Sequence, residues 1–127
     1  MKLGRELEHE QLTDKIIGCA IEVHKRLGPG FLESIYENAF VVELQKKELP
    51  YVKQKEVVVE YDGIEVGKHR LDLFVTDTIV VELKAVKNIE DIHFAIVRFY
   101  LRALGKEHGL LINFSPKVLE VKKVICK

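Results

Sequence analysis

The chain has 127 residues, the length of one ordinary domain, with 47% hydrophobic residues, 31% charged residues and a formal net charge of zero. The zero net charge disfavours a protein that only coats nucleic acid, and no apolar run reaches the ~18–20 residues of a membrane span. The Glu- and Lys-rich start resembles no secretory signal, and Cys19 and Cys126 match neither a disulfide framework nor a metal motif, so we expect a cytoplasmic protein.

Helical signals occupy the first third of the chain. Residues 1–12 are expected to form a loose leader, and Thr13 is the predicted N-cap of a first helix. This helix ends at Gly28-Pro29-Gly30, because Gly suits the left-handed position after a helix and Pro cannot continue it. A second helix is predicted from about residue 31 to residue 47.

An alternating pattern then predicts three consecutive strands. Residues 52–61 and 64–75 flank Asp62-Gly63, which is a strong signal for a hairpin turn. Residues 79–85 alternate again after a short polar break. Three consecutive strands with short connections form an antiparallel meander.

The last third of the chain predicts one more helix and one or two strands. Apolar residues recur at helical spacing over residues 90–104, and Gly105 caps this helix. Residues 109–114 form a short buried strand, and residues 119–125 alternate as an edge strand does. The whole order predicts a single α/β domain over residues 13–127, in which helices pack on a four- to five-stranded mixed sheet.

The end of the chain is basic. Residues 93–127 contain seven basic and two acidic residues, an excess of about five positive charges. The basic residues are Arg98, Arg102, Lys106, Lys117, Lys122, Lys123 and Lys127. A basic end on a neutral domain fits local contact with phosphates, although a solvated Lys-rich helix and strand would give the same count.

Two carboxylates of the meander are predicted to face each other. If residues 76–78 form a three-residue loop, Asp72 lies opposite Glu82 with Cβ atoms ~4.5–5.5 Å apart, and like charges so placed are destabilising. Lys84 shares their face, and a Mg²⁺ or Mn²⁺ ion would neutralise the pair. A slip of one residue would turn one carboxylate away. The alternative is a charged sheet rim in which Lys84 pairs with one carboxylate.

A third carboxylate, Glu33, belongs to the second helix. It falls inside the apolar arc when the helix is plotted at ~100° per residue, and a carboxylate that faces a core needs a partner. Two observations weaken this argument. An acid in the first turn is favoured by the helix dipole, and Glu43 falls in the same arc without a role.

These residues resemble a known signature. Asp72, nine intervening residues and then Glu82-Leu83-Lys84 are similar to the motif of the PD-(D/E)xK nuclease superfamily, which has the restriction-endonuclease-like fold. Residues 30–37, Gly-Phe-Leu-Glu-Ser-Ile-Tyr-Glu, resemble the motif of the GxxExxY family within that superfamily. Further matching residues are Leu27 to Gly30, Arg70 and Leu111 to Phe114.

The resemblance implies a metal site and a catalytic lysine. Asp72, Glu82 and the backbone carbonyl of Leu83 would bind Mg²⁺ or Mn²⁺, and Glu33 would complete the shell directly or through water. Lys84 would activate the attacking water or stabilise the charge that develops on the phosphate. A divalent metal suits this chemistry because it lowers the pKa of bound water and neutralises the phosphate.

The resemblance also suggests substrate contacts and shows one departure. Arg70, Tyr36 and Tyr100 are the candidate substrate-binding residues. In several nuclease branches the helix after the signature carries Gln, three residues and then Tyr. Here Tyr100 stands at the Tyr position and Ile96 at the Gln position. Core packing is the alternative role for Tyr100.

The expected function is a Mg²⁺-dependent nuclease that hydrolyses phosphodiester bonds, with DNA preferred over RNA as its substrate. One alternative is a nuclease-fold module that binds nucleic acid or a protein without cutting, which Ile96 and the zero net charge favour. Another is a scaffold with a vestigial site. Small nucleases of this fold often work as dimers, so the resemblance also suggests a homodimer.

Overall fold

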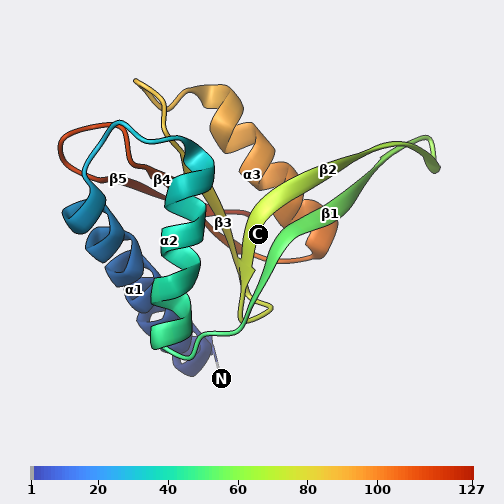
Figure 1. The fold of residues 1–127 in the computed structure, drawn as a ribbon. Coiled ribbons are helices and arrows are strands. Elements are labelled where there is room, and N and C mark those ends of the chain that lie inside the picture. The colour runs from blue at the N-terminus through green and yellow to red at the C-terminus, as the bar shows by residue number, and fades with distance from the viewer. Residues whose placement is uncertain (1) are drawn as a thin grey trace.

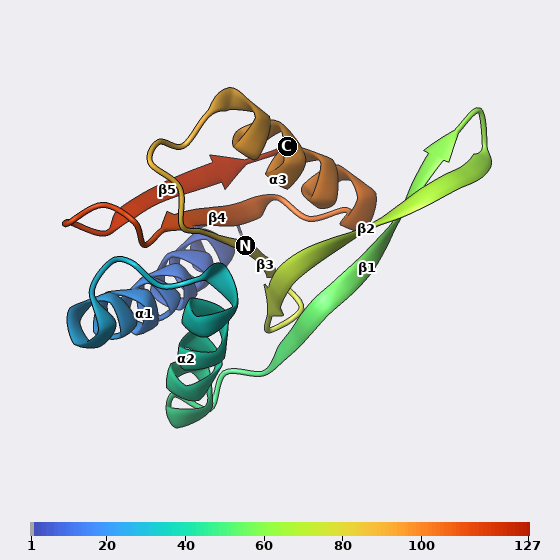
Figure 2. The ribbon, with the colours of Figure 1, turned by 45° about the horizontal axis from the view of Figure 1, so that its top comes forward.

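The computed structural model describes residues 2–127, which form one five-stranded sheet with helices on both faces (Figures 1 and 2). In chain order the elements are α1 (Lys2–Leu27), α2 (Glu33–Lys46), β1 (Tyr51–Tyr61), β2 (Ile64–Val75), β3 (Ile79–Lys84), α3 (Asp91–Leu104), β4 (His108–Asn113) and β5 (Glu120–Ile125). Within these residues, none of the helices has the length and the apolar character of a bilayer span.

The sheet is mixed, as the sequence predicts. The strand order is β1-β2-β3-β4-β5, and β1 to β3 form the predicted antiparallel meander. β3 and β4 run parallel, and β5 returns antiparallel beside β4. α3 makes the crossover that a parallel pair requires.

Two hydrophobic cores lie on opposite faces of the sheet. α1 and α2 pack on one face, and α3 packs on the other (Figure 2). Tyr36, Phe40 and Phe114 are among the large side chains of the first core, and Leu71, Tyr100 and Leu101 are among those of the second. Burial from both sides explains why β3 and β4 are apolar along most of their length.

Gly109 on β4 sets how closely α3 approaches the sheet. A Cβ atom at this position would lie 2.7 Å from Val97 Cγ1 on α3 and 3.4 Å from the Val80 carbonyl oxygen. A contact of 2.7 Å is too short for two carbon atoms. The absence of a side chain at Gly109 therefore allows α3 to rest directly on β4.

α1 is longer than predicted. It begins at Lys2, and Thr13 lies buried within the helix instead of capping it. Several of the preceding residues are strong helix formers such as Glu, Leu and Gln, and Leu12 packs against the first core. His9 also contacts His108 on β4, with ring centroids 4.6 Å apart. The expected loose leader is therefore wrong for residues 2–12, because helix propensity and packing extend α1 toward the N-terminus.

The β1–β2 hairpin projects beyond the rest of the sheet (Figures 1 and 2). Its turn is the predicted Asp62-Gly63, and the positive φ angles of these residues, 52° and 75°, fit a type I′ turn. Among the described strands, β2 pairs with β3 only through residues 73–75, so the outer part of β2 has β1 as its one strand neighbour. We call residues 56–70 the hairpin arm.

Candidate active site

The candidate site lies where β2 and β3 separate. Residues 73–75 pair with residues 79–81, which confirms the predicted three-residue loop. At the next position the main-chain ladder stops. Asp72 N–H donates to Glu82 Oε1 (2.8 Å), and Leu83 N–H donates to Asp72 Oδ2 (2.8 Å). The two carboxylates thus take positions that main-chain carbonyls occupy in a regular ladder, and this exchange holds them side by side.

β2 also changes its facing at Asp72. Leu73 packs in the core beneath α1 and α2, whereas Leu71 packs in the core beneath α3. Alternate residues of a regular strand share one face, so the backbone is irregular between these two leucines. Opposite Asp72 on β1, Gln54 has a positive φ of 53°. Irregularities of this kind re-aim side chains and are common beside active sites.

A cavity of about 200 Å³ opens beside Asp72, between the start of α2 and the sheet. Its lining residues are Glu33, Ser34, Glu37, Gln54, Asp72 and Leu83. Gln54 Nε2 donates to Glu37 Oε1 (2.6 Å) and reaches Asp72 Oδ1 (3.4 Å). Sequence patterns do not single out Glu37 or Gln54. The one available signal is that Glu37 follows Glu33 by one helical turn and so shares its side of α2.

Glu33 lies at the rim of this cavity and not in the core. Its side chain is exposed, and the buried side of α2 includes Tyr36 and Phe40. The helical plot places Glu33 between Phe40 and Leu44, which are both buried but lie about two and three turns further along α2. Glu33 is the first residue of the helix, where the neighbouring Leu32 is 73% exposed. The expectation that Glu33 points toward the core is therefore wrong, although its first-turn position does bring it to the site.

Lys84 is the last residue of β3, two residues after Glu82. Its carbonyl accepts a hydrogen bond from Phe114 N–H (2.9 Å), and it pairs with Asn113 in the parallel ladder. Asn113 is fully buried, and its side chain accepts from Val86 N–H (3.0 Å) and donates to the Val86 carbonyl (2.8 Å). These contacts fix the chain where it leaves Lys84. They give Asn113 and Phe114, the last two residues of the Leu-Ile-Asn-Phe segment, a structural role beside the site.

Burial makes the two carboxyl groups hard to ionise. Loss of hydration raises the pKa of Asp72, an effect that the hydrogen bond from Leu83 opposes and Glu37 reinforces. Loss of hydration also raises the pKa of Glu82, and the neighbouring Asp72 carboxylate raises it further. The positive charge of Lys84 lowers the pKa of both groups. A cation between the two carboxylates would favour their ionised forms.

The donor atoms of the site suit a hard divalent cation. Among residues 2–127, no group of three or more His, Cys, Asp or Glu side chains is arranged to hold a metal. The protein would therefore supply two carboxylates and the Leu83 carbonyl, which are hard oxygen donors. Mg²⁺ keeps several water molecules when bound and commonly uses one or two protein carboxylates together with substrate phosphates. The residues present fit such an ion.

Tyr100 joins α3 to β2 close to the site. Its hydroxyl donates to the Arg70 carbonyl (3.0 Å) and lies 2.7 Å from His69 Nδ1. Burial raises the pKa of this hydroxyl, and the Glu82 and Asp72 carboxylates raise it further. The Tyr100 ring is buried in the core beneath α3. This placement supports the packing role and makes Tyr100 a positioning residue for the strand that carries Asp72.

Arg70 and Ile96, which the family resemblance also singles out, do not line the cavity beside Asp72. The Arg70 side chain is 65% exposed and lies 3.7 Å from Glu56 across the hairpin. It remains accessible to a substrate. Ile96, at the position where related nucleases carry Gln, packs against the core beneath α3. The departure at Ile96 thus replaces a polar site contact with an apolar packing contact.

Tyr36 has a structural role that differs from the predicted substrate contact. Its side chain is fully buried, its hydroxyl donates to the Gly28 carbonyl (2.5 Å), and it accepts from Phe31 N–H (3.2 Å). The ring stacks on Phe114 with centroids 4.5 Å apart. Gly30, between these anchor points, has a positive φ of 107°. In the Gly-x-x-Glu-x-x-Tyr motif, Gly30 and Tyr36 therefore shape the loop that presents the first turn of α2.

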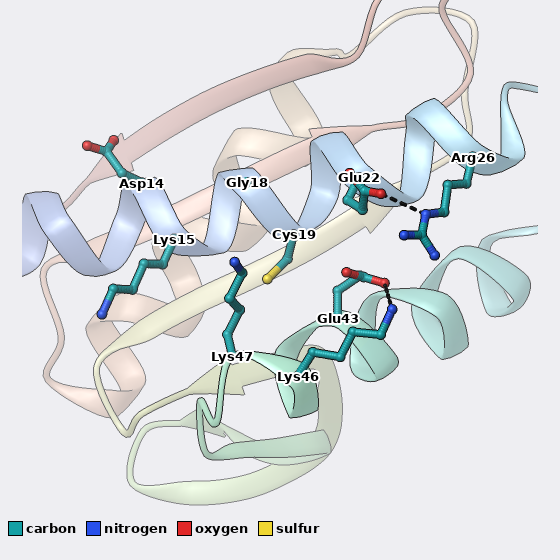
Figure 3. Close-up of a pocket in the computed structure, with 9 residues that line it drawn as sticks. All are labelled: Asp14, Lys15, Gly18, Cys19, Glu22, Arg26, Glu43, Lys46 and Lys47. Atoms are coloured by element: carbon teal, nitrogen blue, oxygen red, sulfur yellow. Dashed lines mark hydrogen bonds and ion pairs between the residues drawn. The ribbon is translucent and has the colours of Figure 1, made fainter.

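A larger cavity of about 500 Å³ lies between α1 and α2, and it was not expected from the sequence (Figure 3). Most of its charged groups are already paired: Arg26 with Glu22 (2.7 Å) and Lys46 with Glu43 (3.1 Å). Cys19 points into it, and burial raises the pKa of this thiol, which makes it a poor nucleophile. The smaller cavity, with the carboxyl groups of Glu33, Glu37 and Asp72 in its lining, is therefore the better candidate for chemistry.

The fold and the site define the class of the protein. A mixed sheet whose meander holds a carboxylate pair and a lysine where two strands separate, with helices on both faces, is a restriction-endonuclease-like architecture. A family model described as the PD-(D/E)XK nuclease superfamily matches residues 10–124. The chain belongs to this superfamily.

A solved structure supports the fold assignment. The crystal structure of a protein named SSO0001 is similar to this chain, with a TM-score of 0.58 and 20% sequence identity. The match covers 72% of this chain and 48% of that protein, so the chain spans about half its length. No curated protein matches the chain.

Proposed function

We propose that the chain is a Mg²⁺- or Mn²⁺-dependent nuclease of the GxxExxY family that hydrolyses phosphodiester bonds, with DNA preferred over RNA. The observation that carries this proposal is the reciprocal bonding of Asp72 and Glu82 to each other's strands, with Lys84 at the end of β3. Two acids whose pKa values are raised by loss of hydration gain most from a bound cation. The superfamily membership supports the same chemistry.

Each site residue then has a role. Asp72, Glu82 and the Leu83 carbonyl would hold the metal, whose chemistry is to neutralise phosphate charge and to lower the pKa of bound water. Glu33, at the rim of the cavity, would complete the shell directly or through water. Lys84 donates hydrogen bonds to the attacking water or to a phosphate oxygen and stabilises the charge that develops there.

One further feature supports nucleic acid as the substrate, and another supports the proposed location. Lys117, Lys122 and Lys123 are exposed on β5 and the loop before it. Such groups bind phosphates in a salt-dependent way. Both cysteines are free thiols, which fits the reducing cytoplasm that we propose as the location.

The proposal is tested by metal-dependent cleavage of labelled single- and double-stranded DNA and RNA. Lys84→Ala and Asp72→Asn should each lower the cleavage rate by about 100-fold or more, as loss of a group that acts on developing charge does. Lys87→Ala, which removes an exposed lysine three residues after Lys84, is the matched control. Circular dichroism checks that each variant is folded. Cleavage that is unchanged in folded Lys84→Ala and Asp72→Asn would overturn the proposal.

A module that binds without cutting is the second candidate, and Ile96 is the observation that favours it. An apolar side chain there removes a polar contact that other branches place near the site. This candidate predicts no cleavage with Mg²⁺ or Mn²⁺. It also predicts salt-dependent binding of nucleic acid that survives Asp72→Asn.

A further inference from the structure

The segment that leads into α2 exposes apolar side chains beside the candidate active site. Phe31 is 43% exposed, Leu32 is 73% exposed and Ile35 is 40% exposed. We call these three side chains the apolar rim. Glu33 and Ser34, which lie between them in the sequence, line the cavity of the candidate site. Large apolar side chains that gather in solvent typically mark a contact surface, and this one borders the site itself.

Leu32 is poorly suited to its position in the fold. It is the N-cap of α2, with φ of −70° and ψ of 153°, and its side chain makes no capping hydrogen bond. Ser, Thr, Asp and Asn are preferred at N-caps because their side-chain oxygens accept hydrogen bonds from amides of the first turn, and Leu cannot do so. The Leu32 side chain also lies in solvent and not in a core. Folding stability therefore does not explain this residue, which favours a role in contact with another molecule.

Phe31 is held by a fixed loop. The Tyr36 hydroxyl donates to the Gly28 carbonyl (2.5 Å) and accepts from Phe31 N–H (3.2 Å), so it joins the two ends of residues 28–31. The Phe31 and Tyr36 rings meet edge to face, at 81° with centroids 6.0 Å apart. Pro29 restricts the backbone between them. A side chain on a preorganised loop loses little conformational entropy when it binds a ligand.

A positively charged loop, residues 114–119, lies beside residues 28–31 (Figures 1 and 2). Phe114 in this loop stacks on Tyr36, with ring centroids 4.5 Å apart. The loop also contains the exposed Lys117 and has no acidic residue. The surface around the apolar rim therefore combines apolar side chains with a positive charge and the cavity of the candidate site.

The hairpin arm provides a second exposed apolar surface for comparison. Tyr61 is 71% exposed and Ile64 is 66% exposed at its tip. Three carboxylates lie among these side chains in the sequence, those of Glu60, Asp62 and Glu65, and such charges repel phosphates. None of the tip residues lines the cavity of the candidate site. Of the two surfaces, the apolar rim is the one whose surroundings favour a nucleic acid.

We propose that the apolar rim binds unpaired bases of a single-stranded DNA segment whose phosphodiester bond lies in the candidate site. Phe31 stacks on one base, Leu32 packs against its neighbour, and Lys117 contacts a phosphate. The faces of bases in a duplex are covered by stacking, so apolar side chains reach them in a single strand, an end or a flap. The inference rests on the proposed function for the nature of the ligand, and it adds that the substrate is single-stranded where it enters the site.

The first test measures the affinity for a fluorescent single-stranded DNA oligonucleotide by anisotropy, in EDTA so that a metal-dependent enzyme cannot cut. Phe31→Ala and Leu32→Ala should each weaken binding by about tenfold, as expected for loss of one contact with a base. Tyr61→Ala removes an exposed aromatic ring from the hairpin arm and should leave the affinity unchanged. A blunt-ended duplex of the same sequence should bind more weakly than the single strand. Circular dichroism checks that each variant is folded.

An oligonucleotide of abasic sites separates contacts with bases from contacts with phosphates. Wild type should bind it about tenfold or more weakly than the normal strand, and Phe31→Ala should change that binding by less than about twofold. Equal losses for Tyr61→Ala and Phe31→Ala, or a full effect of Phe31→Ala on the abasic strand, would overturn the inference. The expected losses in a protein that does not cut would support the inference and contradict the nuclease. Equal cleavage of duplex and single strands that Phe31→Ala leaves unchanged would do the reverse.

Leu32→Ser separates a binding role from a structural one. Ser supplies the missing cap, so this variant should melt about 3 °C higher than wild type while its affinity for single-stranded DNA falls about tenfold. A lower melting temperature together with an unchanged affinity would assign Leu32 to the fold and overturn its proposed contact with a base.

Discussion

The inner and outer parts of β2 differ in what they bury. In the inner part, residues 71–75, the strand is enclosed by two cores and holds a half-buried carboxyl group, Asp72, at the edge of a cavity. In the outer part, residues 64–70, every side chain is exposed, including those of Ile64 and Val66. The free energy of folding alone would favour the opposite, with the apolar side chains buried and the acid exposed. A half-buried acid supports the ion site that we propose in the inner part, and the exposed apolar pair leaves the outer part available for contact with another molecule.

The largest expected effect is a contrast in stability along β2. Leu73→Ala should destabilise the protein by about 3 kcal/mol, because it leaves a cavity in the core beneath α1 and α2. Ile64→Ala should change stability by less than about 0.5 kcal/mol, since its side chain is already in solvent in the monomer. Urea denaturation at low protein concentration measures both. Similar values for the two variants would remove the contrast between the two parts of the strand.

A smaller effect concerns the buried acids. Asp72 and Glu82 have raised pKa values in the folded protein, so they hold protons more tightly than they do in the unfolded chain. Unfolding therefore releases protons above about pH 4, and the metal-free protein should lose stability as the pH rises from there. Glu82→Gln keeps the acceptor for Asp72 N–H and removes the charge. At neutral pH without metal it should stabilise the protein by about 2 kcal/mol.

Two controls sharpen this prediction. The gain from Glu82→Gln should vanish near pH 4, and Glu10→Gln, a change at an exposed acid on α1, should have little effect at any pH. Mg²⁺ or Mn²⁺ should raise the melting temperature of wild type and not that of Glu82→Gln, because binding stabilises only the form with an intact site. Equal metal effects on both proteins would place the ion elsewhere.

The smallest effect is expected in the loop that joins the enclosed parts of β2 and β3. Thr76 and Asp77 have positive φ angles of 50° and 55°, and the Thr76 hydroxyl is buried without a hydrogen-bond partner among the described residues. A β-branched residue is strained in this region. Thr76→Asn with Asp77→Gly should stabilise the protein by about 1 kcal/mol in thermal denaturation. A loss of stability would show that another contact holds the loop.

Local signals predicted the fold and the register well. The Asp62-Gly63 turn and the three-residue loop at residues 76–78 fix strand pairing over short distances, and both are confirmed. The opposition of Asp72 and Glu82 follows from the same loop. In contrast, the sequence did not predict Glu37 and Gln54 at the site. These two residues come from different elements, and only the docking of α2 on the sheet brings them together.

The remaining differences have a similar cause. Thr13 looks like an N-cap, but helix formers continue upstream and the core buries its side chain. The assignment of Glu33 to a buried arc and of Tyr36 to substrate depends on how α2 meets its neighbours. Helical periodicity gives the relative angles of side chains but not the direction in which the helix faces the sheet.

The hydrogen bonds from two backbone amides to the site carboxylates make the charge state of the site measurable by NMR. The amide groups of Asp72 and Leu83 donate to carboxylate side chains and not to carbonyls of a neighbouring strand. Their proton and nitrogen resonances should therefore move when either acid titrates or binds an ion, while amides of the regular ladder at residues 73–75 stay in place. Two backbone signals would then act as built-in reporters of the charge state of the site, with no label attached to any side chain.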